Sequence, residues 1–176
     1  MSGIRNLRDV ALGINASVGK AHLKTSTLFR SGSVDHAEPS DLPALATIVN
    51  LRRSPDPVFE GITPVQVAPT DTMNNYLFEL DIYQDWITRV FEALACCVEY
   101  PILVHCEAGK DRTGVAIALV LKSIGIPDAA IVAEYMLGDG KRYPDSLRML
   151  LGRSTGIRYL QLSEIQRNRL IQTLIH

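Results

Sequence analysis

The sequence contains only three cysteines, Cys96, Cys97 and Cys106, among its 176 residues. An odd number without regular spacing argues against a disulfide framework and against a metal site built on cysteine pairs. Free cysteines are typical of proteins in a reducing compartment. We therefore expect a cytoplasmic protein that needs neither a metal nor a cofactor.

The sequence also lacks an excess of charge of one sign, and it lacks long apolar runs. The formal net charge is −1, which excludes a global field that would recruit nucleic acid or an anionic membrane. No apolar run approaches the roughly 18 residues that a membrane-spanning helix needs. The first residues also lack the apolar centre of a signal peptide. We therefore expect no nucleic-acid partner and no stable insertion into a membrane.

The chain does contain enough apolar material for one core. Hydrophobic residues make up 47% of it and charged residues 21%. A chain of this length fits one domain better than two, and neither a repeat nor a low-complexity segment divides it. We therefore expect a single domain over residues 1–176.

Short apolar segments alternate with longer helical patterns along the sequence. Strands or extended segments are predicted over 23–30, 47–51, 65–68 and 102–105. Helices are predicted over 73–99, 113–125, 129–137 and 163–175. A short helix after Pro39 is expected to be capped by Ser40 or Asp41. This alternation predicts an α/β fold in which helices flank a central sheet of four to five mostly parallel strands.

The order of strand, loop and helix over residues 102–125 matters most for function. The strand 102–105 is apolar enough to be covered on both faces, as in a parallel sheet. The following helix is apolar almost all round and is expected to end near Gly125. Residues 106–112 are therefore expected between the carboxyl end of a strand and the start of a helix, where open α/β sheets bind their ligands.

The loop has the residue types that bind a tetrahedral dianion. Gly109 permits a tight course in which successive amides form an anion nest, and the helix start adds its positive dipole end. Arg112 has a planar guanidinium that can grip two phosphate oxygens. The same groups favour a thiolate at Cys106, which can attack phosphorus and form a phosphocysteine. We expect Thr113 to hydrogen-bond the sulfur, and His105 to orient the loop from behind.

The whole segment 105–114, HCEAGKDRTG, resembles the signature loop of the protein tyrosine phosphatase superfamily. Its version of the loop is similar to that of bacterial and fungal tyrosine phosphatases that also accept phosphoinositides. Weaker likenesses to the same family occur at 6–10, 28–32, 49–52 and 131–135. The resemblance implies a dual-specificity-like cysteine phosphatase fold and a protein tyrosine or dual-specificity phosphatase. The residues expected to bind the phosphate are Glu107, Ala108, Gly109, Lys110, Asp111 and Arg112.

Two aspartates compete for the role of the general acid that protonates the leaving group. The superfamily commonly carries this residue between the preceding strand and the long helix, and Asp71 occupies that place. Asp71 is also a good N-cap for the helix that follows. Asp111 lies inside the loop, where related enzymes with the same KDR sequence use it. Because Lys110 and Arg112 favour its carboxylate form, we rank Asp71 first.

The residues around the loop give opposing indications about the substrate. In the lipid-active phosphatases that the loop resembles, a lysine such as Lys110 helps to bind a multiply phosphorylated inositol ring, whereas Glu107 repels additional phosphates. Tyr76 and Phe78 have the character of a wall for a phosphotyrosine ring, although core packing is the commoner use of such side chains. A phosphorylated protein or small aryl phosphate is the favoured substrate. A phosphoinositide or inositol phosphate is the second candidate, and a silent phosphate-binding module the third.

Two further expectations concern residues around the loop. Asn50 replaces the aspartate that is usual before Leu51-Arg52 in the family, and we expect this change to loosen the support of the loop. Cys96 and Cys97 lie in an apolar helix, where packing is their favoured role. The alternative is that one of them forms a protective disulfide with oxidised Cys106.

Overall fold

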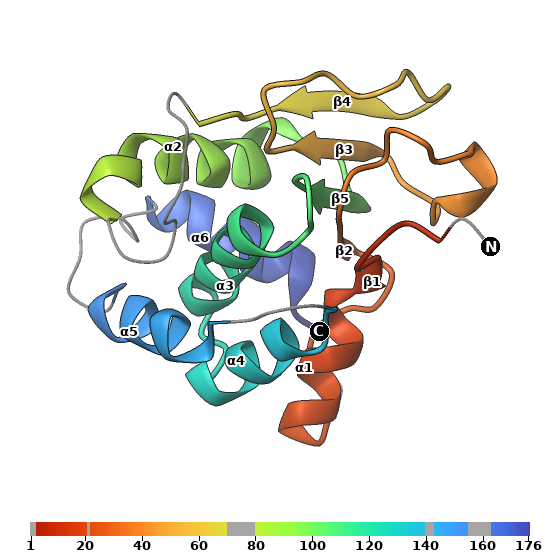
Figure 1. Cartoon of the computed structure of the whole chain (residues 1–176). Helices are drawn as coiled ribbons and strands as arrows, with labels where there is room; N and C mark the ends of the chain where they lie inside the picture. The colour runs from red at the N-terminus through yellow and green to blue at the C-terminus, as the bar shows by residue number, and fades with distance from the viewer. Residues whose placement is uncertain (1–2, 21, 70–79, 140–142, 155–162) are drawn as a thin grey trace.

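A five-stranded sheet lies at the centre of the computed structural model, which describes residues 3–20, 22–69, 80–139, 143–154 and 163–176 (Figure 1). Its strands, in the spatial order β1-β2-β5-β3-β4, are Arg8–Asp9, Leu28–Ser31, Ile102–His105, Thr47–Asn50 and Thr63–Gln66. Strand β1 is antiparallel to β2, and all other neighbours are parallel. The prediction of four to five mostly parallel strands is therefore confirmed.

The register of the three central strands brings their carboxyl ends together. Ser31 in β2 and Asn50 in β3 both pair with His105 in β5. The residues that follow these positions therefore leave the sheet side by side at one edge. This edge is where a parallel α/β sheet places its ligands.

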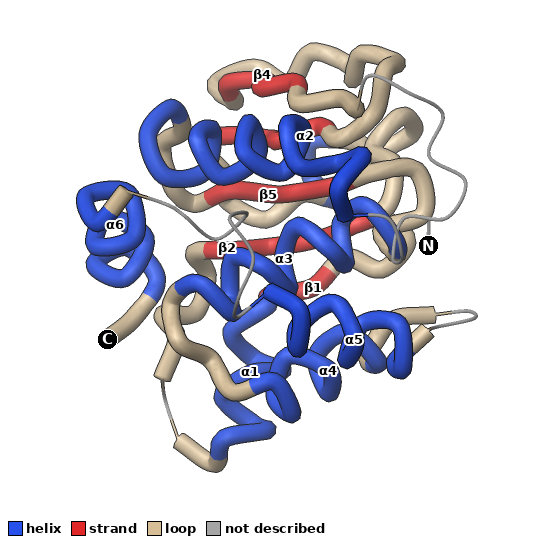
Figure 2. The backbone as a smooth tube through the Cα atoms, turned by 90° about the vertical axis from the view of Figure 1, so that its left-hand side faces the viewer, coloured by secondary structure: helices blue, strands red, loops and turns tan. Residues whose placement is uncertain are grey.

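The helices gather on one face of the sheet (Figure 2). They are α1 Val10–Val18, α2 Leu80–Glu92, α3 Asp111–Ser123, α4 Asp128–Met136, α5 Pro144–Ser154 and α6 Glu164–Leu174. The π-helical segment η2 Ala93–Cys97 extends α2, and the 3₁₀ helix η1 covers Pro39–Asp41. None of the helices, within the part of the chain that is described, is long and apolar enough to cross a bilayer.

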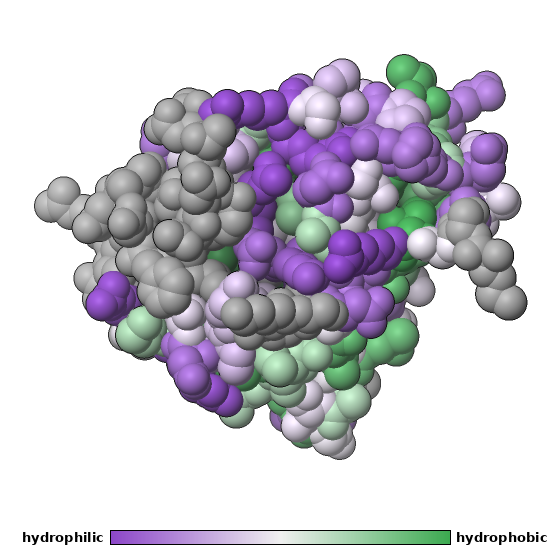
Figure 3. Space-filling view, viewed as in Figure 1, coloured by the Kyte–Doolittle hydropathy of each residue, from purple (hydrophilic) through white to green (hydrophobic). Residues whose placement is uncertain are grey.

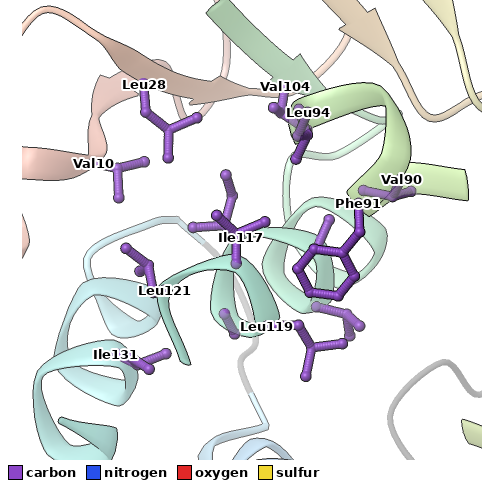
Figure 4. Packing of buried hydrophobic residues seen from close by; sticks show 14 of the residues in the cluster. Val10, Leu28, Val90, Phe91, Leu94, Val104, Ile117, Leu119, Leu121 and Ile131 are labelled. Carbon is purple, nitrogen blue, oxygen red and sulfur yellow. The ribbon is translucent and has the colours of Figure 1, made fainter. Parts of the chain in front are cut away.

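Both faces of the sheet are covered by apolar side chains. Ile102 and Val104 of β5 join the main core with α3, whose side chains from Val115 to Leu121 are all buried (Figure 4). Leu103, between them, points to a second, smaller core that includes Ile48. Because the faces alternate along a strand, the continuous apolar run of β5 follows from burial on both sides. The second face is covered by loop segments rather than by helices.

Several predicted boundaries differ from those observed. The helix predicted over 113–125 begins at Asp111 and ends at Ser123, after which Gly125 has a φ of +90°. The N–H groups of Gly125 and Ile126 bond to the carbonyls of Lys122 and Leu121, so a Schellman motif closes the helix as expected. The helix predicted over 73–99 is described from Leu80 and changes to π-helix at Ala93.

Three other expectations about helices were wrong or incomplete. Helices α1 and α5 were not predicted. The short helix η1 begins after Glu38, and Asp41 accepts the Glu38 N–H at 2.9 Å, so neither Ser40 nor Asp41 is its N-cap. The reason is that the chain turns one residue earlier, with Pro39 at the first helical position that proline favours.

Candidate active site

The nucleophile candidate Cys106 lies directly after β5 and before the start of α3. Cys106 is only 3% exposed, so it is buried below the loop and does not lie on the surface. The loop and helix α3 lie at the carboxyl edge of the sheet, as the sequence predicted (Figure 1). The predicted loop residues 107–110 therefore connect Cys106 to α3, whose first turn contains Asp111 and Arg112.

Gly109 makes a conformation and a close approach that other residues resist. Its φ is +66°, which is the left-handed region that favours glycine. A Cβ at this position would lie 2.5 Å from backbone atoms of Ser31 and Gly32. The loop therefore rests directly on the backbone that follows β2, and only glycine fits at the contact.

The carbonyl groups of four successive loop residues all accept hydrogen bonds from the surrounding protein. The Ser33 N–H bonds to Glu107 O at 3.0 Å, and Asn6 Nδ2 bonds to Ala108 O at 2.8 Å. Arg30 donates to Gly109 O at 3.0 Å, and the Gly114 N–H bonds to Lys110 O at 2.6 Å. A peptide N–H points opposite to its C=O, so fixing the carbonyls outward turns the amides toward the centre of the loop. Such a ring of amides at a helix start can hold an anion.

Two arginines, one of them fully buried, share one buried glutamate and support the loop from behind. Arg30 is fully buried and lies 2.7 Å from Glu134 Oε2, while Arg8 Nε lies 2.8 Å from Glu134 Oε1. Gly114 approaches the ring of Tyr135, the residue after Glu134. The three segments with weak family likenesses therefore lie together behind the loop; they are residues 6–10, 28–32 and 131–135. Their residues act on the site by fixing its backbone.

Arg112 and Thr113 lie in the first turn of α3. The Arg112 guanidinium donates to Leu51 O at 2.9 Å, so β3 helps to orient it. The Thr113 hydroxyl is fully buried and has no hydrogen-bond partner among the residues that are described. Burial of a hydroxyl without a hydrogen-bond partner costs free energy. A hydrogen bond to a group in the loop would offset that cost. Whether this hydroxyl serves the sulfur stays a prediction.

A second support, absent from our sequence predictions, is centred on Arg52. Its guanidinium is almost completely buried and contacts three carboxylates: Asp35 at 2.5 Å, Asp56 at 2.8 Å and Glu107 at 3.1 Å. These partners raise the pKa of Arg52, chiefly through the hydrogen bonds that Arg52 donates to Asp35. Glu107, which we expected to repel phosphates, thus forms an ion pair with a cation. Arg52 is part of the 49–52 likeness. Asp56 lies only four positions away, whereas Asp35 and Glu107 lie 17 and 55 positions away, and no sequence pattern indicated the pairing of Arg52 with any of them.

Asp35 is expected to stabilise the fold only above the pH at which it becomes protonated. Its hydrogen bond with Arg52 lowers its pKa from 3.8 to about 2. A carboxyl whose pKa is depressed by folding contributes stability above about pH 4 and loses it as the pH falls toward about 2. The free energies of unfolding in urea of wild type and Asp35→Asn should therefore differ at about pH 6 and converge on acidification. A difference that does not change with pH would contradict this account.

Asn50 supports the turn after β3 rather than loosening it. Its Oδ1 accepts the Arg52 N–H at 2.7 Å, and its Nδ2 donates to Ser54 O at 2.9 Å. An ionised aspartate has no N–H with which to make the second bond. The expectation that Asn50 loosens the support of the 105–114 loop is not tested by these contacts and stays a prediction.

The structure describes some of the remaining predicted residues, and others lie outside its described part. Asp111 is the first residue of α3, where the helix dipole favours a carboxylate. The favoured general acid, Asp71, and the expected wall residues Tyr76 and Phe78 lie outside the described residues. Cys96 is a free and exposed thiol, so the packing role expected for it was wrong. It lies in the π-helical η2, where Ala93, Leu94 and Ala95 are buried in the core while Cys96 faces solvent.

A pocket of about 260 Å³ opens beside the loop at Glu107. Its lining includes Arg5, Ser33, Asp35 and His36. Hydrophilic residues gather across the centre of the face shown in Figure 3, with apolar residues below them. Among the described residues, no group of three or more His, Cys, Asp or Glu side chains is placed to hold a metal ion.

Comparisons with known proteins agree with this geometry. A candidate tyrosine-protein phosphatase of Cupriavidus necator is 32% identical over 166 residues, covering 76% of this chain and 60% of its own length. The triple specificity protein phosphatase PtpB of Mycobacterium tuberculosis is 56% identical over 36 residues, which is 20% of this chain and 13% of PtpB. This chain therefore spans well under two thirds of the length of either relative.

A solved structure shares the fold. The core catalytic domain of the PP-IP phosphatase Siw14 of S. cerevisiae superposes with a TM-score of 0.53 and 18% identity, over 80% of this chain and 94% of that one. The family model described as "Tyrosine phosphatase family" matches residues 1–152. The protein thus belongs to the tyrosine phosphatase family and has its fold.

Proposed function

We propose that the chain is a cysteine-dependent phosphomonoester hydrolase that acts on phosphotyrosine, with dual specificity toward other phosphorylated residues. The observation that carries this proposal is the ring of loop carbonyls bonded to the surrounding protein, which leaves the amides to face a bound phosphate beside the buried Cys106. Preorganised donors of this kind stabilise the charge that develops on phosphoryl oxygens in the transition state. Membership of the family supports the same activity.

The reaction that we propose proceeds in two displacements. The Cys106 thiolate attacks phosphorus, a sulfur–phosphorus bond forms, and the bond from phosphorus to the leaving oxygen breaks. The leaving oxygen takes a proton from a carboxylic acid, for which we propose Asp71 first and Asp111 second. Water then attacks the phosphocysteine and gives a proton to the carboxylate that was deprotonated in the first step. The sulfur–phosphorus bond breaks, inorganic phosphate is released, and sulfur departs as thiolate with help from the Thr113 hydroxyl. Arg112 and the loop amides hold the equatorial oxygens in both steps.

The charges near the loop favour a substrate with one phosphate. Three carboxylates, Asp35, Asp56 and Glu107, surround the single cation Arg52. This side of the loop therefore retains negative charge, which opposes a second or third phosphate on the same substrate. Lys110 at the rim is the residue that favours the alternative, a phosphoinositide or inositol phosphate.

A substrate panel tests the proposal. Phosphate release should be at least about tenfold faster from a phosphotyrosine peptide than from an inositol ring with several phosphates, a difference of roughly 1.4 kcal/mol in the barrier. Lys110→Gln should then lower the two rates about equally. A faster rate on the inositol phosphate that Lys110→Gln selectively abolishes would favour the alternative. Binding of phosphopeptide without any phosphate release would instead indicate a silent binding module.

We also propose that residues 1–176 act as one phosphatase domain in the cytoplasm. The matched region ends at residue 152, but the segment beyond it is integrated in the fold. Leu170 and Leu174 of α6 are buried in the main core, and Ile175 pairs with Leu23. The C-terminal helix therefore supports the same structure as the site.

A further inference from the structure

The pocket beside the phosphate-binding loop shares residues with the loop and with its support. It has a volume of about 260 Å³, and its lining includes Glu107, the residue directly after Cys106. Ser33, which also lines the pocket, donates its N–H to Glu107 O at 3.0 Å. The pocket is therefore continuous with the candidate active site.

The less exposed part of the lining is mainly apolar, and we call it the floor of the pocket. Ile4 and Ala37 are half-buried and pack against the smaller core. The third half-buried residue is Ser33, whose hydroxyl oxygen already accepts hydrogen bonds from the Arg52 guanidinium and from the Asp35 N–H. The floor therefore favours an apolar group over a polar one.

The exposed part of the lining is a rim with groups of both signs. It consists of Gly3, Arg5, Asp35, His36 and Glu107. The two carboxylates lie 2.5 and 3.1 Å from the guanidinium of Arg52. A cationic or an anionic ligand would meet like charges as well as opposite ones on this rim. Either would also lose water at the apolar floor, which costs free energy, so the pocket fits an uncharged group best.

The size of the pocket fits a single side chain. Sites for whole small molecules typically have volumes of about 300–1,000 Å³, and this pocket is smaller. Consecutive Cα atoms of a peptide lie about 3.8 Å apart, and their side chains point to opposite sides of an extended chain. A peptide whose phosphotyrosine enters the loop can therefore direct the side chain of a nearby residue toward the pocket.

We propose that this pocket is a specificity subsite, which receives an apolar side chain from a residue close to the phosphotyrosine of a substrate peptide. The inference rests on the proposed function for the identity of the substrate. It adds that the enzyme selects a phosphopeptide by a neighbouring side chain as well as by its phosphate. An inositol phosphate carries no apolar group of this kind, so the subsite gives a phosphopeptide an additional contact.

Peptide affinities test the subsite without turnover. Dissociation constants are measured by fluorescence anisotropy with Cys106→Ser and short peptides in which alanines flank a central phosphotyrosine. Leucine, aspartate or lysine then replaces one alanine at a time. At one flanking position leucine should bind about tenfold more tightly than alanine, because it removes about three more carbon atoms from water. Aspartate and lysine at that position should bind no more than about twofold more tightly than alanine.

Two variants connect the leucine preference to the pocket. A Cβ at Gly3 would meet no atom of the described residues within 4 Å, so Gly3→Phe adds a ring at the rim without a backbone clash. It should reduce the preference to within about twofold. Ile4→Thr keeps a β-branched side chain but makes the floor more polar, and it should reduce the preference about threefold. The readout is the ratio of the leucine and alanine dissociation constants, so a general loss of affinity cancels.

Gly152→Phe is the matched control for the added ring. A Cβ at Gly152 would also meet no atom of the described residues within 4 Å. Gly152 lies in α5, on the opposite side of the domain from the N-terminal segment that lines the pocket (Figure 1). The leucine preference of Gly152→Phe should therefore stay within about twofold of the value before this change.

Four outcomes would overturn the inference. They are the lack of a leucine preference above about twofold at every position, a stronger preference for aspartate or lysine, a preference that survives both Gly3→Phe and Ile4→Thr, and the lack of binding by any peptide. Phosphate release from p-nitrophenyl phosphate by the wild type is measured separately, because this small substrate has no flanking residue. Absence of that release would count against the proposed function, and the peptide affinities would still decide on the subsite.

Discussion

Replacement of Cys106 by serine is expected to lower the rate of phosphate release from p-nitrophenyl phosphate by about 10⁴-fold or more. A serine hydroxyl has a much higher pKa than a thiol and is a far weaker nucleophile without an activating base. Initial rates at mildly acidic pH, with equal concentrations of folded protein, measure the loss.

The variant should nevertheless still bind an anion. The loop amides and Arg112 are unchanged in Cys106→Ser, so inorganic phosphate or a phosphotyrosine peptide should bind with wild-type affinity to within a few-fold. Cys96→Ser is the control, because Cys96 is an exposed thiol in η2, and its activity under reducing conditions should match wild type. Activity of Cys106→Ser equal to that of wild type would exclude the proposed mechanism.

Glu134→Gln is expected to cost about 3–5 kcal/mol of the free energy of unfolding, because it leaves buried arginine charge without its partner. The Glu134 carboxylate is the counter-ion of Arg30, which is 0% exposed, and of Arg8. A neutral amide of the same size keeps the packing but removes the negative charge. Unfolding in urea, followed by circular dichroism, gives the free energy.

An exposed ion pair supplies the matched comparison. Asp145 and Arg148 lie 2.7 Å apart on α5 with the aspartate side chain 94% exposed, so Asp145→Asn should change stability by less than about 0.5 kcal/mol. A loss in Glu134→Gln as small as that of Asp145→Asn would show that water or a neighbouring group compensates the arginines. In that case the two arginines would not depend on Glu134 for their burial.

The fold class and the loop could be predicted because their signals are local. The apolar strand Ile102–His105, the glycine-containing loop and the apolar helix after it are contiguous in sequence, and each has a pattern with a known structural preference. The signals of α1 and α5 were weaker. In α1, Gly13 and Asn15 dilute the apolar pattern, although Asp9 at its N-cap and Gly19 with a φ of +70° mark its ends.

The supports behind the loop could not be predicted as contacts, because they join residues far apart in the chain. Arg30 and Glu134 are separated by 104 positions, and His105 and Asp56 by 49. The sequence likenesses marked the segments of Arg30 and Glu134 but not their pairing. No sequence pattern singled out Asp56, because a single acidic residue in a proline-rich loop is most often a solvated surface group.

The brace formed by Arg8, Arg30 and Glu134 also bears on the order of events during synthesis. A nascent chain that has emerged only as far as α3 already contains the whole segment from His105 to Gly114, but it lacks Glu134. Arg30 would then be buried without the carboxylate that neutralises it in the folded domain, so the loop lacks part of its support until α4 is present. The loop that contains Cys106 is therefore expected to take its final course late, when α4 has been synthesised and has packed against α1.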